Sequence, residues 1–128
     1  MRGVTISDKD ARGVLAFDLR DILKYLPNVA DSEWEVGRLE YVAATPVEAF
    51  ERTSDTEERI AGTDLIRLAN EIDQLVEGEV RGYPRGGREP WVIVRAVDST
   101  SFDVLATRED VLEALRRNFA DVVDLPPQ

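Results

Sequence analysis

The stretch WVIVRAVDSTSFDVLA, residues 91–106, decides the fold. In residues 91–97 both the odd and the even positions are apolar, apart from Arg95. Since alternate residues of a strand face opposite sides of the sheet, this pattern is typical of a central strand covered on both faces. The next four residues, DSTS, favour a turn, and residues 102–106 return as a second strand. The stretch therefore predicts an antiparallel hairpin in the middle of a sheet.

The chain before this hairpin predicts strands and two helices. Residues 14–17 form a short apolar run typical of a buried strand, and Asp18 with Asp21 predicts the start of a helix that Pro27 closes. Residues 34–43 alternate, with a change of phase at Gly37 that predicts a β-bulge. The apolar positions of this first helix are Leu19, Ile22, Leu23 and Leu26.

A second helix is predicted to begin at Thr63 and end at Gly78, followed by a short strand over residues 79–83. Between the alternating segment and this helix, residues 46–50 predict a helical turn and residues 53–59 a polar loop. The buried face of the helix comprises Leu65, Leu68, Ala69, Ile72, Leu75 and Val76, which leaves Arg67, Glu71 and Asp73 toward water.

After the hairpin, Thr107 and Asp110 predict a capping box for a third helix, whose buried stripe is Val111, Leu112, Leu115 and Phe119. Residues 121–125 favour an edge strand, and the Gly-rich residues 84–90 a turn. Together these elements predict one α+β domain over residues 1–128, with an antiparallel or mixed sheet of four to six strands packed against three helices.

Composition excludes several classes of function. The 128 residues include no Cys and no His, which excludes disulfides, zinc fingers, Cys nucleophiles, Ser-His-Asp triads and imidazole-ligated metals. We assign no catalytic residue, metal ligand or cofactor. No stretch is apolar enough for a membrane helix or a signal-peptide core, so we expect a cytoplasmic protein.

The net charge of −10 lies in the middle of the chain, where residues 28–80 hold 14 acids against 4 bases. Such a field disfavours nucleic acid and anionic membranes and attracts basic partners. Glu71 and Asp73 belong to this segment and are candidates for contact with such a partner. The alternative is that the acids serve only solubility.

Four further residues are candidates for binding. Arg95 interrupts an apolar strand, so its guanidinium needs a partner, for which Glu35, Glu40 and Asp103 are available, or it serves as an anion-binding group in a pocket. Asp98 and Asp103 flank the hairpin turn and could act together, although turn chemistry also explains Asp98. Trp91, beside Pro90, is a candidate interface anchor.

Arginines 81, 85 and 88 surround three glycines, a composition that suits either phosphate binding or a charged hairpin tip. Their spacing matches neither common phosphate-binding motif.

Four segments carry a resemblance to a known family: residues 17–21 (FDLRD), 74–82 (QLVEGEVRG), 97–104 (VDSTSFDV) and 119–122 (FADV). Together they resemble a family of small bacterial cytoplasmic proteins with no assigned activity, so no catalytic residue is implied. The acidic members of that family are similar in size and charge to immunity proteins that neutralise toxins, which is an analogy only.

Three functional hypotheses follow. The first is a protein-binding module with an acidic docking face, of which an immunity or inhibitor protein for a basic toxin is one form. The second is a small-ligand protein, anion-binding protein or enzyme that uses Arg95 with Asp98 and Asp103. The third is a scaffold or homodimer subunit, for which an exposed patch around Trp91 would be the sign.

Overall fold

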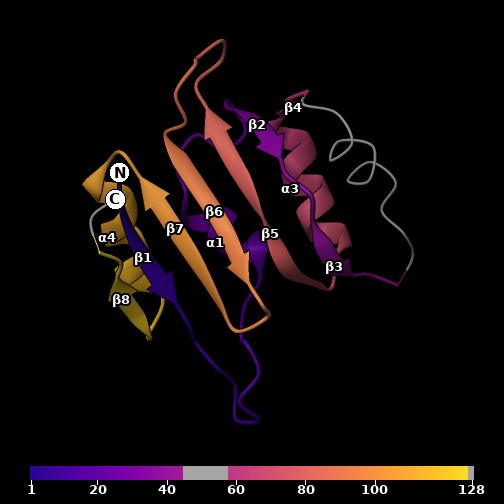
Figure 1. The fold of residues 1–128 in the computed structure, drawn as a ribbon, viewed down its shortest axis with the longest axis vertical. Helices are drawn as coiled ribbons and strands as arrows, with labels where there is room; N and C mark the ends of the chain where they lie inside the picture. Colours follow the sequence, from indigo (N-terminus) through magenta and orange to yellow (C-terminus); the bar gives the residue numbers. More distant parts are fainter. Residues whose placement is uncertain (45–57, 127–128) are drawn as a thin grey trace.

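The computed structural model describes residues 1–44 and 58–126, in which eight strands form an antiparallel sheet (Figure 1). The strand order is β4-β2-β5-β6-β7-β1-β8, and β3 pairs with β5 beside β2. The strands are β1 (Arg2–Ile6), β2 (Glu33–Val36), β3 (Glu40–Val42), β4 (Ile60–Ala61), β5 (Gln74–Tyr83), β6 (Val92–Val97), β7 (Ser101–Ala106) and β8 (Val122–Asp124). The helices are α1 (Leu19–Tyr25), α3 (Gly62–Glu71) and α4 (Glu109–Asn118).

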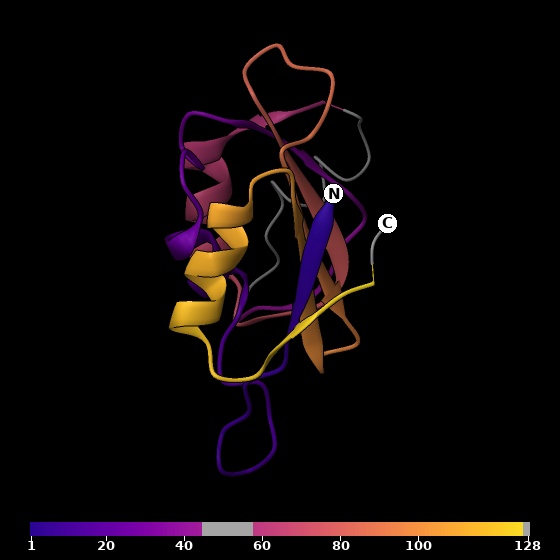
Figure 2. The same ribbon diagram turned by 90° about the vertical axis from the view of Figure 1, so that its left-hand side faces the viewer.

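The predicted hairpin is confirmed, but the prediction that its first strand is buried on both faces is wrong. Strand β6 lies between β5 and β7, as expected for a central strand. Its residues alternate, with Val92, Val94 and Ala96 in the core and Ile93, Arg95 and Val97 half-buried. Figure 2 shows the reason, because all three helices lie on one side of the sheet. The second face of β6 is therefore only partly covered.

The sheet has more strands than the four to six predicted. Strand β1 was not expected, and it pairs with β7 on one side and β8 on the other. The predicted strand at residues 14–17 is wrong: Leu15 makes only an isolated bridge to Lys9, and Val14 is exposed. The edge strand near the C-terminus is confirmed as β8. The predicted helical turn at 46–50 and most of the polar loop at 53–59 lie outside the described residues.

The first helix begins as the sequence predicts, and the other two do not. Asp18 and Asp21 form a complete capping box at the start of α1. In contrast, α3 begins at Gly62 after Ala61, and α4 begins after Arg108, both without a side-chain cap. Gly62 is fixed by packing, since a Cβ there would lie 1.7 Å from the carbonyl oxygen of Val29.

The boundary between α3 and β5 also differs from the prediction. The helix ends at Glu71, and Leu75 belongs to β5, where its backbone N–H donates to the buried Asp18 carboxylate at 3.0 Å. The expected irregularity near Gly37 exists as an interruption between β2 and β3, with a shifted register at β3. Across the interruption, the Gly37 N–H still donates to the carbonyl of Glu79 at 2.9 Å.

A single cluster of buried side chains joins the sheet to the helices. Trp34 and Phe102 are its largest fully buried members from the strands. The helices contribute Leu19, Ile22, Leu23, Leu65, Leu68, Ala69, Val111, Leu112 and Leu115. Each described helix spans seven or ten residues, too short and too polar to cross a bilayer.

Candidate functional site

Arg95 lies on the partly covered face of the sheet, paired with a carboxylate that the sequence did not single out. Its Nε and Nη2 atoms donate to Glu79 Oε1 at 3.1 and 2.9 Å, and Arg81 donates to the other oxygen at 2.6 Å. Partial burial opposes the charged form of Glu79, but the two guanidinium groups outweigh it and hold the pKa of Glu79 below its ordinary value. Glu35, Glu40 and Asp103 were the expected partners, so that prediction is wrong. With a side chain 43% exposed, Arg95 is part of an ion-paired row rather than the floor of a pocket.

Asp98 and Asp103 occupy different places. Asp103 lies opposite Arg95 in the register and accepts a hydrogen bond from Thr5 Oγ1 at 2.6 Å. Asp98 lies in the β6–β7 turn with Ser99, both at positive φ, and its N–H donates to a Glu77 carboxylate oxygen at 2.7 Å. Among the residues that the structure describes, no group of three acidic side chains is arranged to hold a metal ion.

Five acids gather where β3, the start of β5 and the β6–β7 turn meet: Glu40, Glu71, Asp73, Glu77 and Asp98. We call this surface the acidic corner. Glu40 and Glu77 are cross-strand partners at a point where the register shifts between Glu40 and Tyr41, and the Asp73 N–H donates to the carbonyl of Val42 at 2.7 Å. Like charges directly opposite each other on neighbouring strands destabilise a sheet.

The acidic corner differs from the rest of the described surface in how its charges are balanced. Carboxylates elsewhere are often paired with arginine, as in Glu33 with Arg59, Asp64 with Arg67 and Glu79 with Arg95. None of the ion pairs between described residues involves an acid of the corner. Two cations lie beside the corner, but both donate to backbone carbonyls, Lys9 to Thr100 and Arg20 to Ile72. The five acids therefore leave an excess of negative charge there.

A hollow of about 290 Å³ adjoins the acidic corner. Two exposed aliphatic side chains, Val14 and Val42, line it together with Asp21 and Asp73. One cation, Arg20, also lines it and donates to the backbone carbonyl of Ile72 at 3.3 Å. The hollow thus combines apolar surface with carboxylates at its rim.

Trp91 lies at the opposite end of β6, in a second cavity. This cavity measures about 550 Å³. The indole Nε1 of Trp91 donates to Ser32 Oγ at 2.9 Å, and the ring meets Trp34 edge to face. Trp91 is half-buried rather than part of a broad exposed patch.

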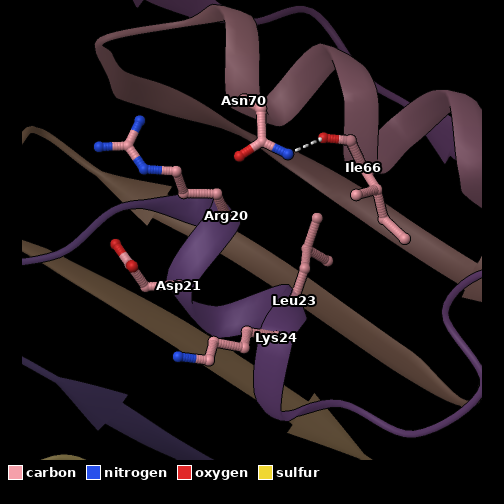
Figure 3. A pocket seen from close by; sticks show the side chains of 6 residues that line it. All are labelled: Arg20, Asp21, Leu23, Lys24, Ile66 and Asn70. Atoms are coloured by element: carbon pink, nitrogen blue, oxygen red, sulfur yellow. Dashed lines mark hydrogen bonds between the residues drawn. The ribbon is translucent and has the colours of Figure 1, made fainter.

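A shallow groove of about 360 Å³ separates α1 from α3 (Figure 3). Leu23 of α1 points toward Ile66 of α3, while Asp21 and Lys24 extend away from that helix. The Asn70 side chain donates to the carbonyl of Ile66 within its own helix. The groove therefore carries a small apolar floor and a mixed-charge rim, with no concentration of either sign.

Asp18 is the carboxylate that the structure buries most clearly, and its role is structural. Burial raises its pKa above the ordinary value of 3.8, although hydrogen bonds from the backbone N–H groups of Leu19 and Leu75 partly oppose the shift. Asp18 joins the start of α1 to the start of β5. It is therefore a tertiary link rather than a reactive group.

Comparison with known protein families, with curated proteins and with solved structures finds no match for this chain. The resemblance carried by residues 17–21, 74–82, 97–104 and 119–122 therefore stays a prediction.

Sequence reasoning missed several residues that define these surfaces. Glu77 was not singled out, and Glu40 was named only as a possible partner of Arg95; strand register, which composition does not encode, brings the two together. Ser32 and Arg108 join Trp91 from segments distant in the chain. The charge excess of residues 28–80 was the one available signal for the acidic corner, since four of its five acids lie in that range.

Proposed function

We propose that this protein binds a basic protein partner through the acidic corner. The observation that carries the proposal is that Glu40 and Glu77 are partners on paired strands and that neither forms an ion pair with a described residue, while Asp73 lies at the same end of β5. Such an arrangement costs stability, and surfaces that serve binding are where proteins commonly carry such costs.

The hollow beside the corner supports a basic rather than a neutral partner. Lysine and arginine side chains combine an apolar stem with a charged head. Val14 and Val42 offer apolar surface to such a stem, and Asp73 offers a carboxylate to the head. The one cation in the described lining, Arg20, is engaged with the carbonyl of Ile72. Opposite charge would also accelerate association and make it sensitive to salt.

An immunity or inhibitor protein for a basic toxin is the specific form of this function that we favour. The net charge of −10 and the small size of the chain support it. The competing hypothesis of a site built from Arg95 with Asp98 and Asp103 has less support, because Arg95 pairs with Glu79 on an open face of the sheet and the two aspartates lie in different places.

The test is affinity capture from the native cell lysate with three proteins. One is the wild type, and one is the corner variant Glu40→Gln, Asp73→Asn, Glu77→Gln. The third is a control of equal net charge, Glu58→Gln, Glu89→Gln, Asp121→Asn, whose substitutions lie elsewhere on the surface. The Glu77→Gln substitution keeps a side-chain oxygen that can accept from the Asp98 N–H, so the turn should be preserved.

The proposal expects one basic protein that the wild type and the control retain at low salt and release at high salt. The corner variant should fail to retain it while giving an unchanged circular dichroism spectrum. Equal retention by the corner variant would overturn the proposal, as would capture of nothing but further copies of this chain.

A further inference from the structure

The cavity around Trp91 lies at the end of β6 opposite to the acidic corner. Figure 1 shows the β5–β6 loop at this end of the sheet. The cavity volume of about 550 Å³ falls within the range of small-molecule sites. The lining residues come from the turn after α1, the β5–β6 loop and the residue before α4: Asn28, Asp31, Ser32, Pro84, Arg85, Trp91 and Arg108.

Trp91 is held in one orientation in this cavity. Buried Ser32 accepts the indole N–H at 2.9 Å and itself donates to the carbonyl of Asn28 at 2.8 Å. The backbone carbonyl of Trp91 accepts from the N–H of Thr107 at 3.1 Å. This bond connects Trp91 to the segment that joins β7 to α4. A fixed, half-buried indole presents a ready stacking surface, because little rotamer freedom is lost when a ring packs on it.

Two guanidinium groups line the same cavity as the indole, and each has N–H donors beyond those in its hydrogen bonds. Arg108 uses Nε and one terminal nitrogen on Asp110, at 3.1 and 2.6 Å. Arg85 donates through Nε to the carbonyl of Asp31 at 3.2 Å, and its ion pair with that residue is long, at 3.9 Å. Because a guanidinium carries five N–H donors, both groups keep donors for an anion.

We infer that this cavity binds a small molecule that joins a planar ring to a phosphate or carboxylate. The ring stacks on Trp91, and the anionic group lies between Arg85 and Arg108. Two acids of residues 28–80 also lie at this end of the sheet. Asp31 lines the cavity and pairs with Arg85 at 3.9 Å, and Glu33 pairs with Arg59 and accepts from the Gly86 N–H.

Tryptophan fluorescence tests this site, with adenosine monophosphate and benzoate as probes for the two anionic groups. Adenosine and inorganic phosphate supply the ring and the anion separately. At least one of the two joined probes should quench saturably, about tenfold more tightly than either separate part. Trp91→Phe should abolish the quenching, because the remaining Trp34 is fully buried.

Arg85→Gln and Arg108→Gln should each weaken binding of that probe about tenfold, since each removes charge-assisted hydrogen bonds. Arg88→Gln is the matched control, in the same loop but outside the cavity lining, and should bind normally. Arg108→Lys, which keeps the charge without the planar fork, should lie between the wild type and Arg108→Gln, and its folding is checked by circular dichroism.

Preference for the nucleotide identifies a larger ligand with a phosphate as the class that fits, and preference for benzoate a smaller ligand with a carboxylate. No saturable quenching by either probe at millimolar concentration would overturn the inference, as would equal affinity in the Arg85 and Arg88 variants. The inference does not rest on the acidic corner, so the corner variant should bind the probe as the wild type does.

Discussion

Replacing Asp18 by alanine tests whether one side chain joins helix α1 to strand β5. The variant removes the N-cap of α1, typically worth about 1 kcal/mol. It also leaves the buried N–H of Leu75 without its acceptor, which costs about 1–3 kcal/mol. The desolvation of the carboxylate, which raises its pKa, offsets part of what these bonds contribute. We expect the free energy of unfolding to fall by about 2–3 kcal/mol.

Urea unfolding followed by circular dichroism measures this loss, with Asp21→Ala as the matched control. Asp21 contributes only the reciprocal bond of the capping box, to the N–H of Asp18, so its loss should cost about 1 kcal/mol or less. Asp18→Asn keeps a cap and an acceptor oxygen and should also lose little. If Asp18→Ala cost no more than Asp21→Ala, the link between α1 and β5 would be energetically unimportant.

The same carboxylate gives a pH dependence of known sign. Because the folded pKa of Asp18 is raised above 3.8, its contribution to stability is fully present below pH 3.8 and declines as the pH rises through the folded pKa. Asp18→Asn does not titrate there. The stability of the wild type relative to Asp18→Asn should therefore fall over that interval, and a rise would contradict the burial of the charge.

Three further variants test the packing, the ion pairs and the acidic corner. Gly62→Ala places a Cβ 1.7 Å from the carbonyl oxygen of Val29, so thermal unfolding should reveal a loss of about 3 kcal/mol or failure to fold, and wild-type stability would refute this close approach. Arg95→Met removes one of two cations from Glu79, whose lowered pKa gives stability above pH 4.5 that is lost as the pH falls through the folded pKa. The variant should lose less than about 1 kcal/mol at neutral pH and show a weaker acid dependence in urea titrations; an unchanged dependence would contradict the pairing. Glu40→Gln should raise stability by about 0.2–1 kcal/mol by relieving its cross-strand repulsion, and a loss in urea unfolding would argue against that repulsion.

The parts of the fold that local chemistry controls could be predicted from the sequence. The capping box of α1 uses residues three apart, and the β6–β7 hairpin is marked by its turn residues. The end of α3 could not be predicted, since Leu75 continues the helical spacing while its N–H binds Asp18, 57 residues away. Strand β1 could not be predicted either, because it is formed by pairing with β7 and β8, which lie at the far end of the chain.

In the candidate sites, too, local composition could be predicted from the sequence and contacts between distant residues could not. The excess of acids over residues 28–80 was visible in the composition, but only strand register places Glu40 opposite Glu77. Arg95 was recognised as a charge in need of a partner, yet the register pairs β5 with β6 so that Glu79 fills that role. Position in the sheet, rather than residue type, decides that Glu79 is paired with two arginines while Glu40 and Glu77 form no ion pair with a described residue.

The affinity of the captured partner for the corner variant and for the equal-charge control, measured by surface plasmon resonance at two salt concentrations, tests the proposed function most directly. Docking at the acidic corner predicts that the corner variant binds roughly tenfold or more weakly than the control at low salt, and that the difference shrinks at high salt. Equal weakening of the two variants would mean that net charge alone governs binding, and would contradict a docking site at Glu40, Asp73 and Glu77.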